Sequence, residues 1–469
     1  MNKKLMALAV AAAVTAPGLA VAQVPTTLTA QPCVASNAGI TLYGRVDETV
    51  MYDQYKGAAS TLIADVKKSD IYSPGNAMGV KGREDLGGGT AAWFQLEIGV
   101  WPSERLDTAS VTGNNWGGRN SGIGISSGAG DIMFGVWDTP YKQVDFIWNS
   151  INSGGFSAGG VLMNMADSTG ALNNALCSNT VSPASGSVAQ TPPSANACMT
   201  EATLSSTAWS RRVNNSVQYW SPVMSGFQVK LMTAMAPYQA ASSAPNFQNG
   251  LPKPKEYSAN ATWARGPLSL WLGYDFHQGL RPTTTGAFPG TIPSVAVNGV
   301  IDSKDTAIQV AGKWNFGPGE IGVGYEQITY GNNAVSGATD LGIKVPAYVV
   351  NGRFNAGPGA LWASYSGTDA KSCTQAGATA ATAIGSAVCG AKAKMYSLGY
   401  DYILSKRTKM YIAYNKIDNG TVTTNAGAVQ GSSYYYIAGP ATNNGNGNSG
   451  ALAAGTDVTT FGLGIQHVF

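Results

Sequence analysis

The sequence predicts an all-β protein, a transmembrane antiparallel β-barrel of 16 strands. Residues 1–22 have the pattern of a cleavable signal peptide, in which Lys3 and Lys4 precede an apolar stretch and an Ala-x-Ala site precedes the cleavage point. After residue 22 no apolar run approaches the roughly 20 residues of a membrane-spanning helix. Only strands that close on themselves could then cross a membrane, so we expect residues 23–469 to form an exported barrel.

The composition favours this class. Only 12% of the residues are charged, against about 25% in a typical soluble domain. The mean hydropathy of −0.04 excludes a helical membrane protein, whereas a polar lumen alternating with a lipid face averages to such a value. The formal charge of +3 includes Lys3 and Lys4, so the mature chain is nearly neutral and has no bulk field that would recruit nucleic acid.

Sixteen segments of about ten residues alternate apolar with polar side chains or are rich in β-forming residues. They lie near 39–52, 76–84, 90–101, 118–127, 131–138, 213–220, 226–235, 256–264, 267–276, 305–315, 319–329, 346–355, 359–367, 394–403, 407–417 and 457–469. Glycine-rich or proline-rich short links alternate with long ones, as in barrels with short periplasmic turns and long extracellular loops. The third outer loop spans about 139–212 and the eighth about 418–455.

The side-chain register assigns faces to the better strands. Leu268, Leu270 and Leu272 share one face, which we expect to contact lipid, while charged neighbours line the lumen. Segment 118–127 alternates poorly, because Gly122 and Gly124 would face lipid if Arg119 faces inward. The last segment needs a pairing partner, and the strand containing Tyr43-Gly44-Arg45 would close the barrel.

Several motifs together resemble one family, the Gram-negative general porins of the β/γ-proteobacterial type. The matching stretches are 76–90, 94–97, 135–141, 213–227, 400–408 and the terminal Phe469. The resemblance implies an outer-membrane homotrimer without a cofactor, in which each subunit is a water-filled channel for passive diffusion of ions and small hydrophilic solutes. It also implies that the third loop folds into the pore and that Phe469 is a signal to the barrel-assembly machinery.

In that family, carboxylates on the third loop face a ladder of basic residues across the constriction. Matched by motif, the basic wall comprises Arg45, Arg119 and, more loosely, Arg211 or Arg212, and the lumen acid is Glu97. The loop acids are Asp138, Asp145 and Asp167. Ala77 stands where the family usually carries an arginine, so the basic wall has one positive charge fewer at this position. Each of these charges could instead be a solvated lumen residue without effect on selectivity.

The third loop is unusually apolar around Phe146, Trp148 and Phe156. These side chains could pack against the inner wall as in any long loop. They could alternatively form an aromatic track for a particular solute, which would make the protein a substrate-preferring channel.

The cysteines fit an exported protein. Two local disulfides, Cys177–Cys198 and Cys373–Cys389, are the simplest pairing, and each would close a loop within an outer segment. Cys33 would then remain as a free thiol. The alternative is that all five cysteines are reduced.

Other function classes have weaker support. The two histidines, His277 and His467, have no companion at a spacing typical of metal ligands. Neighbouring strand residues point to opposite faces, so we do not expect Asp275 and His277 to form a catalytic dyad. We therefore predict no enzyme and no metal site. A structural or adhesive barrel remains an alternative because the eighth loop is long, nearly uncharged and contains Tyr434-Tyr435-Tyr436.

Overall fold

The computed structural model describes the barrel wall and parts of the loops. The described residues are 39–56, 66–73, 75–100, 102–103, 117–148, 156, 209, 212–235, 255–278, 283–284, 300–333, 343–369, 392–423, 429–431 and 456–469, with fewer side chains at the ends of some segments. The predicted signal peptide, Cys33 and both predicted disulfides lie outside this part.

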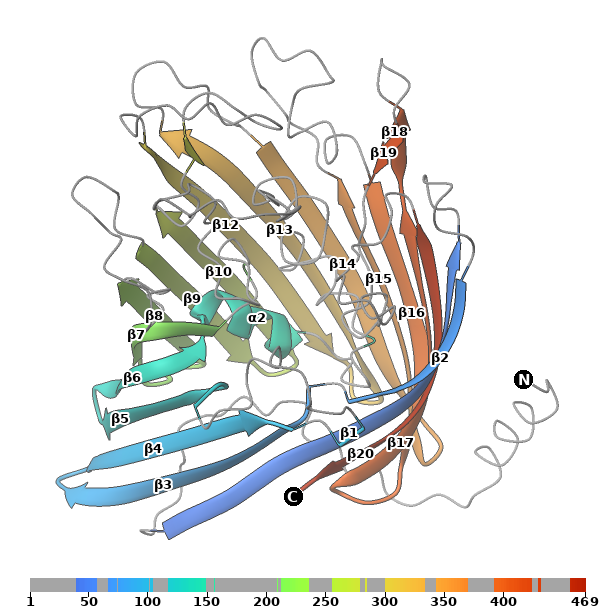
Figure 1. The fold of residues 1–469 in the computed structure, drawn as a ribbon. Coiled ribbons are helices and arrows are strands. Elements are labelled where there is room, and N and C mark those ends of the chain that lie inside the picture. The colour runs from blue at the N-terminus through green and yellow to red at the C-terminus, as the bar shows by residue number, and fades with distance from the viewer. Residues whose placement is uncertain are drawn as a thin grey trace, which may run out of the picture.

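Sixteen antiparallel strands form the wall within the described residues (Figure 1). They are β1 (Gly39–Lys56), β3 (Ala77–Gly87), β4 (Thr90–Gly99), β5 (Ser121–Ser127), β6 (Gly130–Asp138), β7 (Arg212–Trp220), β8 (Phe227–Met235), β9 (Lys255–Arg265), β10 (Leu268–Gln278), β12 (Val300–Asn315), β13 (Gly319–Asn333), β14 (Ile343–Ala356), β15 (Gly359–Asp369), β16 (Lys392–Ile403), β17 (Thr408–Asn419) and β20 (Asp457–Val468). Each strand pairs with the next, and β20 pairs with β1, so the predicted strand number and closure are confirmed.

Five smaller elements were not predicted. β2 (Val66–Tyr72) continues the line of β3, because β1 pairs with β3 over residues 39–45 and with β2 over 49–55. The sequence of β2 includes the charged residues Lys67, Lys68 and Asp70, so it lacks the apolar alternation that indicated the other strands. The others are β11 (Thr283–Thr284), β18 (Thr421–Thr423), β19 (Val429–Gly431) and the helix α2 (Pro140–Trp148).

The strands have an apolar outer face and a polar inner face. On β10, Leu272 is 49% exposed on the outside, whereas Asp275 on the inside is fully buried. Strand β5 does not have the orientation that an inward Arg119 would imply: Ile123 and Ile125 face outward, and Gly124 faces inward against Trp93. The reason is that Arg119 precedes the strand, so its orientation does not set the strand's alternation.

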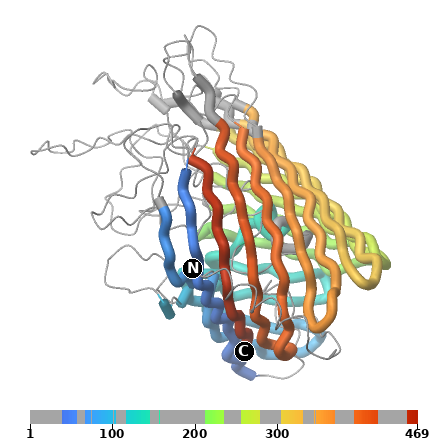
Figure 2. The backbone as a smooth tube through the Cα atoms, turned by 90° about the vertical axis from the view of Figure 1, so that its right-hand side faces the viewer, coloured from blue at the N-terminus to red at the C-terminus, as the bar shows by residue number. Residues whose placement is uncertain are grey.

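At the closing seam, β20 lies between β1 and β17 and pairs with both (Figure 2). Leu463 and Ile465 are exposed on the outer face, while Gln466 is buried on the inner face. Phe469 continues the pairing beyond β20, since its backbone N–H donates to the Gly44 carbonyl and its carbonyl accepts from Gly44 N, each at 3.0 Å. The predicted neighbour of the last strand is therefore confirmed.

Candidate functional site

The helix α2 begins where β6 ends, at a strong local start signal. Thr139 is the N-cap, and its Oγ1 accepts a hydrogen bond from Lys142 N at 3.1 Å. Pro140 occupies the first helical position, where the missing N–H costs nothing and the fixed φ suits a helix. Among the described residues, no helix is long and apolar enough to cross a membrane.

The start of α2 packs against the inner face of the wall formed by β9, β10 and β13. Asn260 Nδ2 donates to the Pro140 carbonyl at 2.7 Å, and Tyr141 N donates to Ser258 Oγ at 3.0 Å. Gly273 makes room for the helix, because a Cβ there would lie 3.2 Å from Val144 Cγ2. The segment between β6 and β7 thus starts inside the barrel.

Two further side chains of this segment also contact inward-facing wall residues. Phe156 is fully buried and lies against Gly462 of β20, so a side chain at that glycine would overlap its ring. Trp209 is fully buried and stacks on His277 of β10, with ring centroids 3.9 Å apart. The described part of this segment therefore contacts the middle strands β9 and β10 and the final strand β20.

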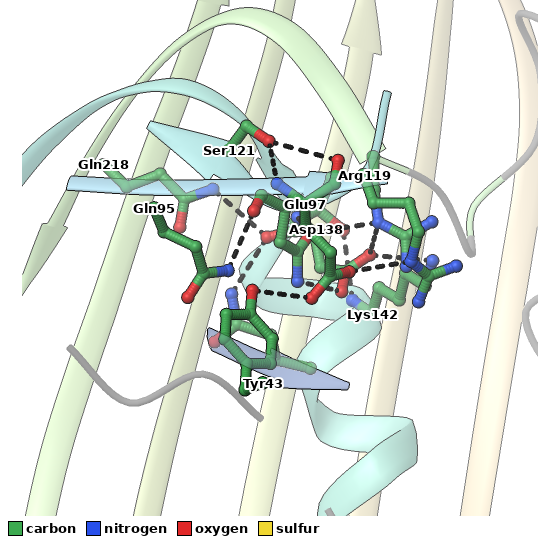
Figure 3. A network of polar contacts seen from close by, with 12 residues as sticks. Tyr43, Gln95, Glu97, Arg119, Ser121, Asp138, Lys142 and Gln218 are labelled. Carbon is green, nitrogen blue, oxygen red and sulfur yellow. Dashed lines mark hydrogen bonds and ion pairs between the residues drawn. The ribbon is translucent and has the colours of Figure 1, made fainter. Parts of the chain in front are cut away.

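Asp138, at the end of β6, is the centre of the first charged cluster (Figure 3). Its Oδ1 lies 2.8 Å from Lys142 Nζ and 3.3 Å from Arg212 Nε. Its Oδ2 accepts a hydrogen bond from Asn120 Nδ2 at 2.8 Å, and its backbone N donates to Asn120 Oδ1 at 3.0 Å. The carboxylate is therefore held by two cations and an amide at the base of α2.

Glu97, on β4, is the centre of a second cluster beside the first (Figure 3). Arg119 Nε lies 2.7 Å from its Oε1, and the Tyr43 hydroxyl donates to its Oε2 at 3.0 Å. Ser121 Oγ accepts from Glu97 N at 2.9 Å. Arg119 is 23% exposed and Glu97 5%, so the arginine is the more accessible member of the pair.

The surroundings of Lys142, on the helix α2, change the pKa of its side chain. Burial lowers the pKa of Lys142 to about 8; Asp138 opposes this shift, and Arg212 adds to it. Because the unperturbed lysine pKa is near 10.4, this ammonium group can lose its proton at mildly alkaline pH.

Other cations face the lumen elsewhere. Arg45, on the inner face of β1, donates to the carbonyl of Gly75 in the break between β2 and β3. Lys230 on β8 donates to Gln143 Oε1 at 2.7 Å and lies over the Trp220 ring. Near the seam, Asp401 binds Arg353 at 2.7 Å and Lys409 at 3.2 Å.

The structure brings four of the predicted charges into the two clusters: Glu97, Arg119, Asp138 and Arg212. Arg45 faces the lumen on β1, and its cross-strand partner is the small buried Ala77. Arg211 and Asp167 lie outside the described residues, as do the side chains of Asp145, Phe146 and Trp148, although these three positions belong to α2.

Sequence reasoning missed Lys142, Lys230, Asn120 and Tyr43. Thr139-Pro140 was a signal for the helix, and a helix starting there places Lys142 one turn from Asp138. Lys230 was missed only as a site residue, because its alternation with Phe227, Val229 and Leu231 correctly predicts that it faces the lumen. Asn120 and Tyr43 had none, because their roles depend on contacts between strands that are distant in sequence.

One expectation about His277 was wrong. Asp275 and His277 are two positions apart, so they share a face rather than pointing oppositely. Asp275 Oδ1 lies 3.7 Å from His277 Nε2, and Glu256 Oε1 on β9 lies 3.8 Å from the same nitrogen. All three side chains are buried on the inner wall.

A family model described as Gram-negative porin matches residues 7–422. The chain belongs to the Gram-negative porin family. This porin is 37% identical over 134 residues to the major outer membrane protein P.IB of Neisseria gonorrhoeae, an alignment covering 28% of the chain and 36% of that relative. A Neisseria meningitidis serogroup B protein of the same name is 33% identical over 129 residues, covering 26% and 36%. The alignments span about a third of the length of these relatives.

Solved structures agree with the fold. An anion-selective porin from Comamonas acidovorans superposes with a TM-score of 0.59 at 20% identity, covering 92% of this porin and 100% of that chain. OmpT of Vibrio cholerae gives 0.54 at 14% identity, covering 93% and 99%. The predicted family, barrel and outer-membrane location are thus confirmed, and the prediction that the protein is not an enzyme is supported by its family membership.

Proposed function

We propose that this porin is a channel through which ions and small hydrophilic solutes diffuse passively across the outer membrane. The main support is the contrast between the two faces of a closed barrel, apolar outside and lined by ionised and amide side chains inside. A charge pair at 4 Å is worth about 1 kcal/mol in bulk water and several times more where the effective dielectric constant is lower. A few lumen charges can therefore bias the passage of ions.

The constriction in this proposal is formed by the segment of about 139–212 against the wall that carries the two charged clusters. Contacts of α2 with Ser258 and Asn260, and of Phe156 with Gly462, support an inward course of this segment. Arg45, Arg119 and Arg212 supply its basic charges, and Glu97 and Asp138 supply its acidic charges, although Arg119 pairs with Glu97 and Arg212 with Asp138. Arg211, Asp145 and Asp167 keep their roles as predictions from the resemblance.

The proposal includes three features of the family. The protein would be exported by the signal peptide 1–22, inserted by the barrel-assembly machinery with Phe469 as its signal, and assembled as a homotrimer in contact with outer-membrane lipid. Cross-linking of the purified protein in detergent tests the trimer, and mass spectrometry of its N-terminus tests cleavage before Gln23.

A planar-bilayer experiment tests the channel. Purified protein should give stepwise conductance in KCl, and the reversal potential in a salt gradient should shift toward cation preference in Arg119→Gln and toward anion preference in Glu97→Gln. Arg265→Gln, at the exposed end of β9, is the matched control and should leave the potential unchanged. An absence of conductance would favour a structural or adhesive barrel, and equal potentials in all variants would remove Arg119 and Glu97 from the selectivity site.

The alternative of a substrate-preferring channel has no support from Phe156. This ring is fully buried against the wall, so it packs rather than presenting a surface along which a solute could slide. A solute whose flux saturates while the ion current stays linear would nevertheless establish such a preference.

A further inference from the structure

We propose that Glu256, Asp275 and His277 form a binding site for one divalent transition-metal ion on the inner wall, here called the triad site. Each residue offers one ligand atom, and these atoms all lie within 4.8 Å of one another. Among the described residues, these three form the group of His, Cys, Asp and Glu side chains whose ligand atoms lie close enough together to hold one ion.

The strand geometry explains why the three side chains meet. Asp275 and His277 are two residues apart on β10 and share its inner face. Glu256 is the cross-strand partner of His277 on β9, so its side chain stands beside the imidazole on the same face. The site is therefore built on two paired strands of the wall rather than on a loop, which keeps the ligand positions fixed.

The distances are close to those of an occupied site. His277 Nε2 lies 3.8 Å from Glu256 Oε1 and 3.7 Å from Asp275 Oδ1. In a tetrahedral zinc site with bonds of about 2.0–2.1 Å, neighbouring ligand atoms are about 3.4 Å apart. The two distances from His277 Nε2 exceed this value by less than about half an ångström, and all three ligand atoms lie within 4.8 Å of one another. Rotation of the carboxylate side chains would complete the geometry.

The ligand types select the class of ion. Carboxylate and carbonyl oxygens alone suit calcium or magnesium, whereas an imidazole nitrogen together with carboxylates suits zinc and other first-row transition metals. One histidine and two carboxylates leave a coordination position for water or a solute group. Zn²⁺ is therefore the appropriate probe.

The surroundings orient the ligands. Trp209 stacks on the imidazole with an interplanar angle of 9° and so fixes the plane of the ring. Asp275 Oδ1 accepts a hydrogen bond from Phe276 N at 2.9 Å, which restrains that carboxylate. Asp305, the partner of His277 on β12, adds another buried carboxylate next to the imidazole. Such outer groups commonly orient metal-binding histidines and strengthen metal binding.

Metal content provides the test. Wild-type barrel and variants are refolded with Zn²⁺, desalted and measured by elemental analysis, with the folded fraction determined by the heat-dependent shift in electrophoretic mobility. We expect one zinc per folded wild-type chain, and at least a tenfold loss of affinity in Glu256→Gln and in Asp275→Asn. Both substitutions keep the side-chain size and leave the stacked His277 in place.

Two matched variants control for other sites. His467→Gln removes the other histidine, which is exposed on the outer face, and Asp53→Asn changes a buried inward carboxylate on β1. Both should bind zinc as the wild type does. The proposal is overturned if folded wild-type protein holds no zinc above a chelator-treated blank, or if the triad variants retain wild-type affinity. Because the readout is metal content, failure of the channel proposal would not affect it.

Discussion

At the scale of single residues, Asp138 shows how one carboxylate organises the charged site. Its carboxylate holds Lys142 and Arg212 together, and both cations are largely buried. Two like charges at such a short separation require the intervening anion, because burial weakens solvent screening. Asp138 is therefore a structural requirement of the charged site as well as a candidate selectivity residue.

Replacing this carboxylate should be costly. Asp138→Asn leaves two buried cations without their counter-ion, and breaking a buried pair in this way typically costs about 3–5 kcal/mol. Asp418→Asn removes the partner of Lys416 from a pair in which both side chains are more than a third exposed, so it should cost less than about 1 kcal/mol. Denaturant unfolding in lipid vesicles measures both, and equal costs would contradict the assigned role of Asp138.

Lys142 should make ion selectivity depend on pH. Its pKa of about 8 lies below the ordinary lysine value, so the ammonium group is protonated at pH 7 and mostly neutral at pH 9. Loss of a positive charge raises the permeability of cations relative to anions, and reversal potentials should therefore move toward cation preference with a midpoint near pH 8. Lys142→Arg keeps its charge throughout, and an identical pH profile in that variant would exclude Lys142 as the titrating group.

The helix α2 shows how one small residue on the wall positions an element. A Cβ at Gly273 would stand 3.2 Å from Val144 Cγ2 and 3.3 Å from Tyr141 Cδ2, so the glycine sets how closely the helix approaches β10. The hydrogen bonds from Asn260 and to Ser258 then fix its position along the wall.

A larger side chain at this point should displace the helix toward the lumen. We expect Gly273→Val to lower single-channel conductance, because the added methyl groups occupy the space in which α2 now packs. Gly352→Val is the control, since a Cβ at Gly352 meets only the Glu320 carbonyl oxygen, at 3.6 Å. A conductance in Gly273→Val equal to that of wild type would show that α2 does not narrow the pore.

At the scale of the whole molecule, alternation predicted the barrel well because lipid and water impose a strict period of two on each strand. Leu268, Leu270 and Leu272 are exposed as predicted. The charged site was less accessible to such reasoning. The contact of Tyr43 with Glu97 spans 54 positions, and that of Tyr141 with Glu326 spans 185, so these partners are set by strand register and barrel closure rather than by a local motif. The error for Asp275 and His277 was local, because residues two positions apart on a strand share a face.

Barrel closure yields a prediction that separates two roles of Phe469. The resemblance assigns it to recognition by the assembly machinery, whereas its backbone bonds and its ring contact with Gly44 give it a structural role at the seam. In refolding without other proteins, Phe469→Ala should lower stability by about 1–2 kcal/mol through loss of apolar contact. Deletion of Phe469 should cost about 1–3 kcal/mol more, because two backbone hydrogen bonds are lost as well.

The control for this prediction is Phe316→Ala, which removes an equally exposed ring, at 39%, from a turn away from the seam. In vitro it should cost about as much as Phe469→Ala, but in cells only the Phe469 variants should accumulate unassembled protein. If both Phe469 variants refold with wild-type stability and fail only in cells, the residue acts as a signal alone. If they are unstable in vitro, part of any assembly defect follows from the seam itself, because an unclosed barrel leaves the edges of β1 and β20 without partners.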